Sequence, residues 1–345
     1  MSFEWLEEVL ACPVCGRPVK RGSDSYRCTG CSRLFPIRYG IPDFRLAPDP
    51  YISVEDEIRK VEGFSATGRS FTEMVKAYYA LTPESPPELH RHYLEAMAAA
   101  TSRGSGILKK LQARYPDVPR KRLLDLGCGT GGMSIAAAAQ YAQVAGVDVA
   151  LRWLVMGQQR LAEQNVSLPL ICANAESLPF RDGMFQTVVA DAVVEHVRSS
   201  VRMRDETLRV LEPSGAFFFT TNNRFSILPE PHVRLFGFGL LPRALMEPVA
   251  RRVRRTPYKA RLHSRRELKQ IFKGFGSVLL PWYEASEIGE RHAVLVRLWD
   301  RLRAIAPARA LLGAVVPQYF ISGRRADSPA APARPSAEGQ APPAP

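Results

Sequence analysis

Apolar and polar positions follow two different patterns along this chain. Between about residue 119 and residue 222, apolar runs of strand length recur at Arg122–Leu126, Gln143–Asp148, Leu168–Cys172, Thr187–Ala190 and Ala216–Thr221. Helical stretches such as Met133–Tyr141 and Leu151–Glu163 lie between them. Strands that are apolar throughout are typical of a sheet covered by helices on both faces. The pattern therefore predicts an α/β fold with a doubly wound, mostly parallel sheet.

The segments around this core have other compositions. Residues 1–46 are rich in Cys, Gly and Pro and predict a small module of turns, whereas residues 51–118 are helix-biased but interrupted by prolines and predict a helical linker or cap. After an apolar insertion at about 225–270, Ser277–Tyr283 and Gln318–Ser322 are candidate closing strands. They would complete a seven-stranded sheet in a core spanning 119–323. Residues 326–345 are mostly Pro, Ala and Ser, which predicts a disordered tail.

A glycine-rich loop follows the first core strand. Gly127, Gly129 and Gly132 match G-x-G-x-x-G, a loop that allows close approach of a nucleotide cofactor but fits several cofactors. Asp125 precedes the loop and would repel a pyrophosphate, but it suits the ammonium and sulfonium groups of S-adenosylmethionine. Asp148 ends the next strand, about 20 residues on, where a carboxylate can accept hydrogen bonds from ribose hydroxyls. The alternative for Asp148 is a helix N-cap.

Four blocks in order carry a resemblance to a known family. They are LLDLGCGTGG from Leu123, VAGVDVA from Val144, NAESLPFRDGMFQTVVADAVVEHV from Asn174, and LRVLEPSGAFFFTT from Leu208. This part of the chain resembles the class I S-adenosylmethionine-dependent methyltransferases, especially methyltransferase type 11. The resemblance implies a Rossmann-like fold with S-adenosyl-L-methionine as cofactor.

The resemblance also assigns cofactor-binding residues. Asp125 and the glycines would face the methionine end and Asp148 the ribose, while Asn174, Ala175 and Glu176 would lie beside the adenine. Asp191 would close the site after the fourth strand, and Cys128 and Val149 belong to the same cofactor-binding set. Two departures are visible, because the family often has Asp where this chain has Asn174 and Gln186.

Four cysteines form two CxxC pairs separated by twelve residues: Cys12, Cys15, Cys28 and Cys31. Two such pairs can hold one Zn²⁺ tetrahedrally, with no open coordination position, so the zinc would be structural. Paired disulfides are the alternative. Together with Phe35–Phe44, the module resembles the zinc ribbon of small activator subunits that partner methyltransferases. Docking, substrate presentation and stabilisation are all open as its role.

The acceptor of the methyl group is suggested by charge and by the insertion. The net charge of +13 favours an anionic partner, and Phe225–Pro242 is apolar while Arg251–Arg255 is basic. This combination suits an anionic membrane surface and predicts a small-molecule acceptor that is apolar or lipid-linked. An apolar cap over a soluble pocket is an alternative reading of the same segment.

Two other functions compete with this prediction. The first is an RNA (rRNA or tRNA) methyltransferase that docks substrate through the zinc ribbon and the basic face. The second, a non-catalytic scaffold, is disfavoured by the acidic pair around the glycine loop. Glu195 and His196 follow the fourth strand and are candidate catalytic residues, although His196 could equally belong to a hydrogen-bond network at a helix start. Without a signal-like N-terminus or an apolar run of about 18–20 residues, we expect a cytoplasmic protein, peripheral at the inner membrane face.

Overall fold

The computed structural model describes residues 3–65, 68–83, 85–226, 228–274, 277–279, 301, 305 and 314–325. The predicted tail at 326–345 lies outside the described residues, as do positions 280–283 of the first predicted closing strand.

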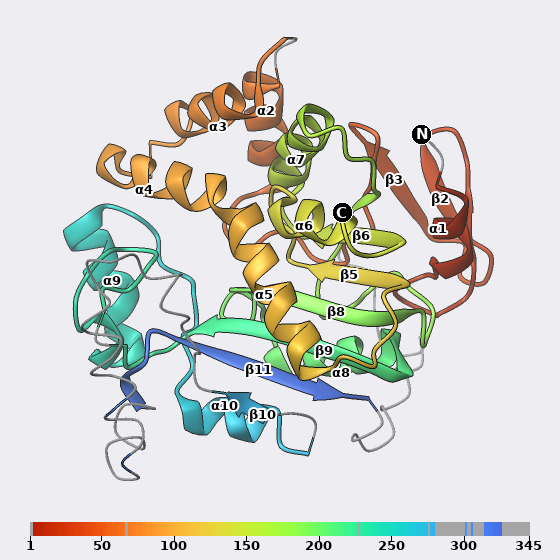
Figure 1. Ribbon diagram of the computed structural model, residues 1–345. Helices are drawn as coiled ribbons and strands as arrows, with labels where there is room; N and C mark the ends of the chain where they lie inside the picture. The colour runs from red at the N-terminus through yellow and green to blue at the C-terminus, as the bar shows by residue number, and fades with distance from the viewer. Residues whose placement is uncertain are drawn as a thin grey trace.

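The central sheet has the strand order β10-β11-β9-β8-β5-β6-β7 (Figure 1). Its strands are β5 Arg122–Leu126, β6 Gln143–Asp148, β7 Leu170–Cys172, β8 Phe185–Asp191, β9 Leu211–Asn222, β10 Ser277–Leu279 and β11 Gln318–Arg324. Neighbours from β9 to β7 run parallel, whereas β11 pairs antiparallel with both β9 and β10. The predicted parallel, Rossmann-like core is therefore confirmed. Strands that follow β5 in sequence are added first on one side of it (β6, β7) and then on its other side (β8, β9). The loops after β5, β6 and β8 therefore lie together at one edge of the sheet.

Both faces of this sheet are buried, as the apolar strands predicted. Successive side chains of β9 alternate between the two faces, so that Phe217 and Phe219 enter one core while Phe218 enters the other. The core around Phe218 contains Leu108 and Leu111 of α5, Ala100–Arg114, which packs closely on α6, Gly132–Ala138. The same core includes residues of α7, Leu151–Glu163, while α8, Ser200–Val210, covers the opposite face.

The region before α5 is helical, as expected. It consists of α2 Val54–Phe64, α3 Phe71–Ala80 and α4 Pro87–Ala98. In Figure 1 these helices lead into α5, which crosses the sheet diagonally. Helices α2 and α3 pack on each other and on α7, so this segment is built against the core.

The N-terminal module contains more regular structure than its sequence indicated. A short helix, α1 Glu4–Val9, precedes a four-stranded antiparallel sheet of β1 Val19–Arg21, β2 Ser25–Cys28, β3 Leu34–Arg38 and β4 Ile41–Pro42. The helix was not predicted, because only two of its six residues, Leu6 and Val9, are buried. The module also docks on the core: Phe44 N donates to Cys172 O at 2.7 Å, which continues the central sheet beyond β7.

The insertion after β9 forms its own small apolar cluster. It contains η1 Phe238–Leu240, α9 Arg243–Arg254 and α10 Arg265–Ile271, and Val233, Phe238 and Met246 are buried together. In Figure 1 the insertion around α9 lies across the molecule from the N-terminal module. Among the described residues, no helix combines the length and apolar character needed to cross a bilayer.

Candidate active site

The loop between β5 and α6 depends on glycine. Gly127, Gly129 and Gly131 have φ values of 73°, 52° and 77°, in the left-handed region that favours glycine. A Cβ on Gly127 would also lie 2.3 Å from a methyl carbon of Val193. Gly132 has a different role, because a Cβ there would lie 2.5 Å from Cβ of Ala100. It therefore permits α6 to pack against α5, while Gly131 makes the turn.

Two buried carboxylates flank this loop. Asp125 is 1% exposed and accepts a hydrogen bond from Ser134 Oγ at 2.5 Å. Asp148 accepts from Gly129 N and from Ala150 N, both at 2.8 Å. Burial raises the pKa of Asp125 to about 7 and that of Asp148 to about 6. The N-cap of α7 is Ala150 and not Asp148, so the N-cap alternative for Asp148 is wrong.

These groups open into a cavity of about 560 Å³. Every residue assigned to cofactor binding lines it, and so does His196: Asp125, Gly127, Cys128, Gly129, Gly132, Asp148, Val149, Asn174, Ala175, Glu176 and Asp191. Aromatic and apolar side chains from the helical region, among them Tyr79, Tyr93 and Met97, line another part. The insertion contributes His232 and Tyr258, so it forms part of the wall, as the cap alternative expected.

Asn174 lines the cavity, but its amide is already engaged. Its Oδ1 accepts from Leu46 N at 2.8 Å and Ala47 N at 3.1 Å, and its Nδ2 donates to Ala47 O at 3.0 Å. Both lone pairs of the amide oxygen are used. The expected contact of this oxygen with an adenine amino group is therefore revised: Asn174 anchors the chain that leaves the cysteine module.

Glu195 and Asp191 are also held by neighbours. Glu195 is 1% exposed, does not line the cavity, and accepts from Thr221 Oγ1 and Asn222 Nδ2, both at 2.7 Å. These bonds make it an anchor for the end of β9, so its expected catalytic role is not carried forward. Asp191 accepts from Thr220 Oγ1 at 2.6 Å and pairs with Arg103 of α5 at 2.7 Å, which ties the helical cap to the strand end.

His196 belongs to a line of polar side chains that sequence reasoning missed. Tyr51 Oη lies 2.9 Å from His196 Nδ1, and His196 Nε2 lies 3.0 Å from His232 Nε2. His232 Nδ1 contacts Glu230. Burial lowers the pKa of His196 to about 3, whereas for His232 burial is outweighed by the charge of Glu230 and the pKa is raised. No local signal could have found Tyr51 or His232, which come from the linker and the insertion.

The four module cysteines converge on one point. Their Sγ atoms all lie within 4.8 Å of one another, with Cys15 and Cys28 at 3.3 Å and Cys12 and Cys31 at 3.7 Å. Thiolates on one tetrahedral Zn²⁺, at a Zn–S distance of about 2.3 Å, are about 3.8 Å apart, so the residues present fit this metal. A disulfide needs about 2.05 Å. None of the chain's six cysteines is disulfide-bonded, so the disulfide alternative is not supported.

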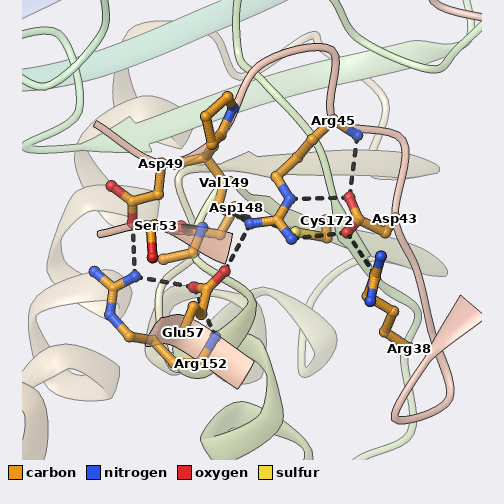
Figure 2. Close-up of polar contacts among 12 residues, drawn as sticks. Arg38, Asp43, Arg45, Asp49, Ser53, Glu57, Asp148, Val149, Arg152 and Cys172 are labelled. Atoms are coloured by element: carbon orange, nitrogen blue, oxygen red, sulfur yellow. Dashed lines mark hydrogen bonds and ion pairs between the residues drawn. The ribbon is translucent and has the colours of Figure 1, made fainter. Parts of the chain in front are cut away.

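A buried ion network joins the module to the cofactor side of the core (Figure 2). Arg45 lies between Asp43 and Glu57, with N–O distances of 2.7 Å to each, and also donates to Val149 O at 3.1 Å. Arg152 of α7 continues the network, at 2.9 Å from Glu57 and 2.7 Å from Asp49. The network thus holds the linker next to Val149, the residue that follows Asp148.

Comparison with known proteins agrees with this geometry. Residues 124–219 match the family model described as the methyltransferase domain. The central segment is therefore similar to this domain family. A ubiquinone biosynthesis O-methyltransferase of Burkholderia thailandensis is 34% identical over 111 residues, which are 32% of this chain and 48% of that protein. A demethylmenaquinone methyltransferase of Clavibacter sepedonicus is 36% identical over 37% of this chain and 50% of its own length.

Two further proteins are also similar to this chain. A malonyl-[acyl-carrier protein] O-methyltransferase of Legionella pneumophila is 32% identical over 34% of this chain and 41% of its own length. The structure of phosphoethanolamine N-methyltransferase 2 of Haemonchus contortus with S-adenosyl-L-methionine has a TM-score of 0.45 at 18% identity, covering 82% of this chain and 61% of that one. The chain spans at most about half the length of the three sequence relatives named here.

Proposed function

We propose that this protein is an S-adenosylmethionine-dependent methyltransferase whose acceptor is a small, apolar or lipid-linked molecule. The observation that carries the proposal is the pairing of Asp125 and Asp148 around a glycine loop, in a cavity whose other side is aromatic and apolar. Carboxylates at this position suit a cation. When bound, the cofactor supplies an electrophilic methyl group on a sulfonium. The protein's residues align it with the acceptor.

The names of the relatives support the acceptor class. Enzymes of ubiquinone biosynthesis, demethylmenaquinone methylation and malonyl-[acyl-carrier protein] methylation act on small or carrier-linked molecules. Aromatic side chains such as Tyr79, Tyr93 and Trp153 in the cavity wall are suited to a planar or apolar acceptor. The acceptor prediction therefore rests on these aromatic lining residues.

Cofactor binding is testable by ligand-induced stabilisation. S-adenosylhomocysteine at 100 times its Kd should stabilise the protein by about 2.7 kcal/mol, seen as a rise in Tm. Asp148→Asn should reduce this rise, whereas Asp24→Asn, the same change on an exposed carboxylate of the module, should leave it unchanged. A wild-type protein with no rise in Tm would contradict the proposal.

For the cysteine module we propose a structural Zn²⁺ held by Cys12, Cys15, Cys28 and Cys31. The convergent Sγ atoms support it, as do the bonds that Gly30 N and Cys31 N donate to Cys28 Sγ at 3.3 and 3.4 Å. Elemental analysis should find one zinc per chain. Cys28→Ser should lose it and destabilise the module, while Cys172→Ser, a buried thiol outside the cluster, should retain it.

We further propose that the insertion contacts an anionic lipid surface. Phe236 and Leu240 are 76% and 70% exposed, and the adjoining helix α9 carries Arg251 and Arg252 on an amphipathic surface. Vesicles containing anionic phosphatidylglycerol should retain the protein in flotation, and Phe236→Ser with Leu240→Ser should release it. Copurifying RNA lost with rising salt, without flotation, would favour the RNA alternative instead.

A further inference from the structure

We propose that Tyr51, His196, His232 and Glu230 form a proton relay that removes the proton of an aromatic hydroxyl acceptor. The inference rests on the proposed methyltransferase function and names the substrate class of the same site. Tyr51 and His196 would be the catalytic end of the relay, in the cavity, while His232 and Glu230 are positioning residues that act through them.

Glu230 fixes the direction of the relay. Its Oε2 accepts from the backbone N–H groups of His232 and Val233, at 2.8 and 2.9 Å, and its Oε1 accepts from Tyr258 Oη at 3.3 Å. Both carboxyl oxygens of Glu230 therefore act as hydrogen-bond acceptors. The contacting ring atom, His232 Nδ1, must therefore carry a proton and donate it to Glu230.

The remaining protons follow in sequence. When His232 is neutral and protonated at Nδ1, its Nε2 is bare and can only accept, so His196 Nε2 donates across the 3.0 Å contact. His196 Nδ1 is then bare and accepts from Tyr51 Oη across 2.9 Å. Each hydrogen bond points from the cavity toward Glu230. The Tyr51 oxygen is left with lone pairs free to accept a proton from a bound hydroxyl.

The transfer is balanced. As the methyl–sulfur bond breaks and the bond from methyl carbon to acceptor oxygen forms, the acceptor's proton passes to Tyr51 Oη. The proton of Tyr51 moves to His196 Nδ1, and the proton on His196 Nε2 moves to His232 Nε2. The result is a His232 imidazolium beside the Glu230 carboxylate. The lowered pKa of His196 and the raised pKa of His232 agree with this resting place for the charge.

The charges around the relay favour a hydroxyl over an amine that arrives as a cation. Lys259 lies 5.9 Å from the centre of the Tyr51 ring, and Arg103 and Arg198 also line the cavity. The nearby carboxylates are already occupied: Asp49 by Arg152, Glu195 by Thr221 and Asn222, and Asp191 by Arg103 and Thr220. Tyr258, which also lines the cavity, donates to Glu230. The aromatic wall suits the ring of a phenol.

Histidine-ring ¹⁵N NMR of the full chain with bound S-adenosylhomocysteine tests the relay. We expect His196 as the Nε2–H tautomer and His232 protonated at Nδ1, with His232 taking up the second proton first on acidification. Glu230→Gln should lower the pH of that uptake by about 1–3 units, and Glu230→Asp should restore part of it. Tyr51→Phe should shift the signal of His196 Nδ1. Tyr93→Phe is the control and should not shift it, because among the described groups the Tyr93 hydroxyl bonds only the His232 carbonyl.

The acceptor class is tested in the same sample. Catechol and 1-naphthol should perturb the His196 signals in wild-type protein and much less in Tyr51→Phe, while ethanolamine should not perturb them. An Nδ1–H tautomer of His196, or perturbation by ethanolamine but by neither phenol, would overturn the proposal. So would a metal bound by His196 and His232 with Glu195, detected as a second metal ion lost in His232→Gln. Failure of S-adenosylhomocysteine to raise the Tm would instead refute the proposed function itself.

Discussion

Replacing Asp125 by Asn is expected to stabilise the ligand-free protein while weakening its binding of S-adenosylmethionine. Asp125 is 1% exposed, and among the described residues its carboxylate receives one side-chain hydrogen bond, from Ser134. Burial, together with the charges of Asp191 and Asp148, raises its pKa to about 7. The wild-type protein therefore holds a charge in a place that disfavours it, and binding of a cation would compensate.

The size of the effect follows from the shift in pKa. Well below pH 4 the carboxyl is protonated in both folded and unfolded chains, so it costs nothing. As the pH rises from 4 to 7 the unfolded chain ionises first, and the folded state loses roughly 4 kcal/mol over a shift from 3.8 to about 7. The pKa of about 7 already includes the bond from Ser134, so Asn avoids this loss and gives up only the difference between its own bond with Ser134 and that of a protonated carboxyl, at most about 1.5 kcal/mol. The net stabilisation at pH 8 is then roughly 3–4 kcal/mol.

Urea denaturation of the ligand-free protein at pH 4.5 and pH 8 measures this difference, with Asp24→Asn as the exposed control. Asp125→Asn should be more stable than wild type at pH 8, and its advantage should be much smaller at pH 4.5. Calorimetric titration should show a loss of S-adenosylmethionine affinity of about 10- to 100-fold. An equal change in stability at both pH values, or an unchanged affinity, would refute the reasoning.

Three other predictions concern the same part of the molecule. Because the pKa of Asp125 is raised to about 7 and that of Asp148 to about 6, S-adenosylmethionine should bind more tightly at pH 8 than at pH 5.5, and titration in buffers of different ionisation heat should show proton release. Arg45→Met should cost about 3–5 kcal/mol in urea denaturation, because it removes the cation between the buried carboxylates of Asp43 and Glu57. Arg38→Met, with a side chain 37% exposed, should cost less than about 1 kcal/mol. Asn174→Ala should destabilise by about 1–3 kcal/mol and speed proteolysis near residue 47; resistance equal to wild type would contradict the anchor role.

The parallel core was predictable because its signals are local. Strands β5 and β6 and helix α7 have the bounds that the apolar runs indicated. The apolar positions of each element pack against neighbours within the same parallel core. The sequence pattern of the segment alone is therefore enough to predict it. The glycine loop was predictable for the same reason: the left-handed turn at Gly127 and Gly129 is a property of the loop itself.

The polar line through His196 was not predictable, because it is assembled from distant segments. Tyr51 is 145 positions from His196 in the sequence, and His232 is 36 positions away. Neither lies in a periodic pattern that specifies which way its side chain points. Only the docking of the linker and the insertion over the same strand ends brings the three rings together. Glu195, adjacent to His196 in sequence, points instead to β9.

The two departures from the family pattern each place an amide between a donor and an acceptor, and one of them contacts the chain leaving the cysteine module. Asn174 accepts from two backbone N–H groups and donates to Ala47 O, and a carboxylate could not make that third bond. Gln186 likewise accepts from Arg122 N at 2.7 Å and donates to Glu212, where an aspartate would face a like charge. In both places an amide replaces an acid because the neighbours include both a donor and an acceptor. At Asn174 these neighbours belong to the chain leaving the cysteine module. The residue whose predicted adenine contact had to be revised is therefore the one that attaches the module to the cofactor side of the core.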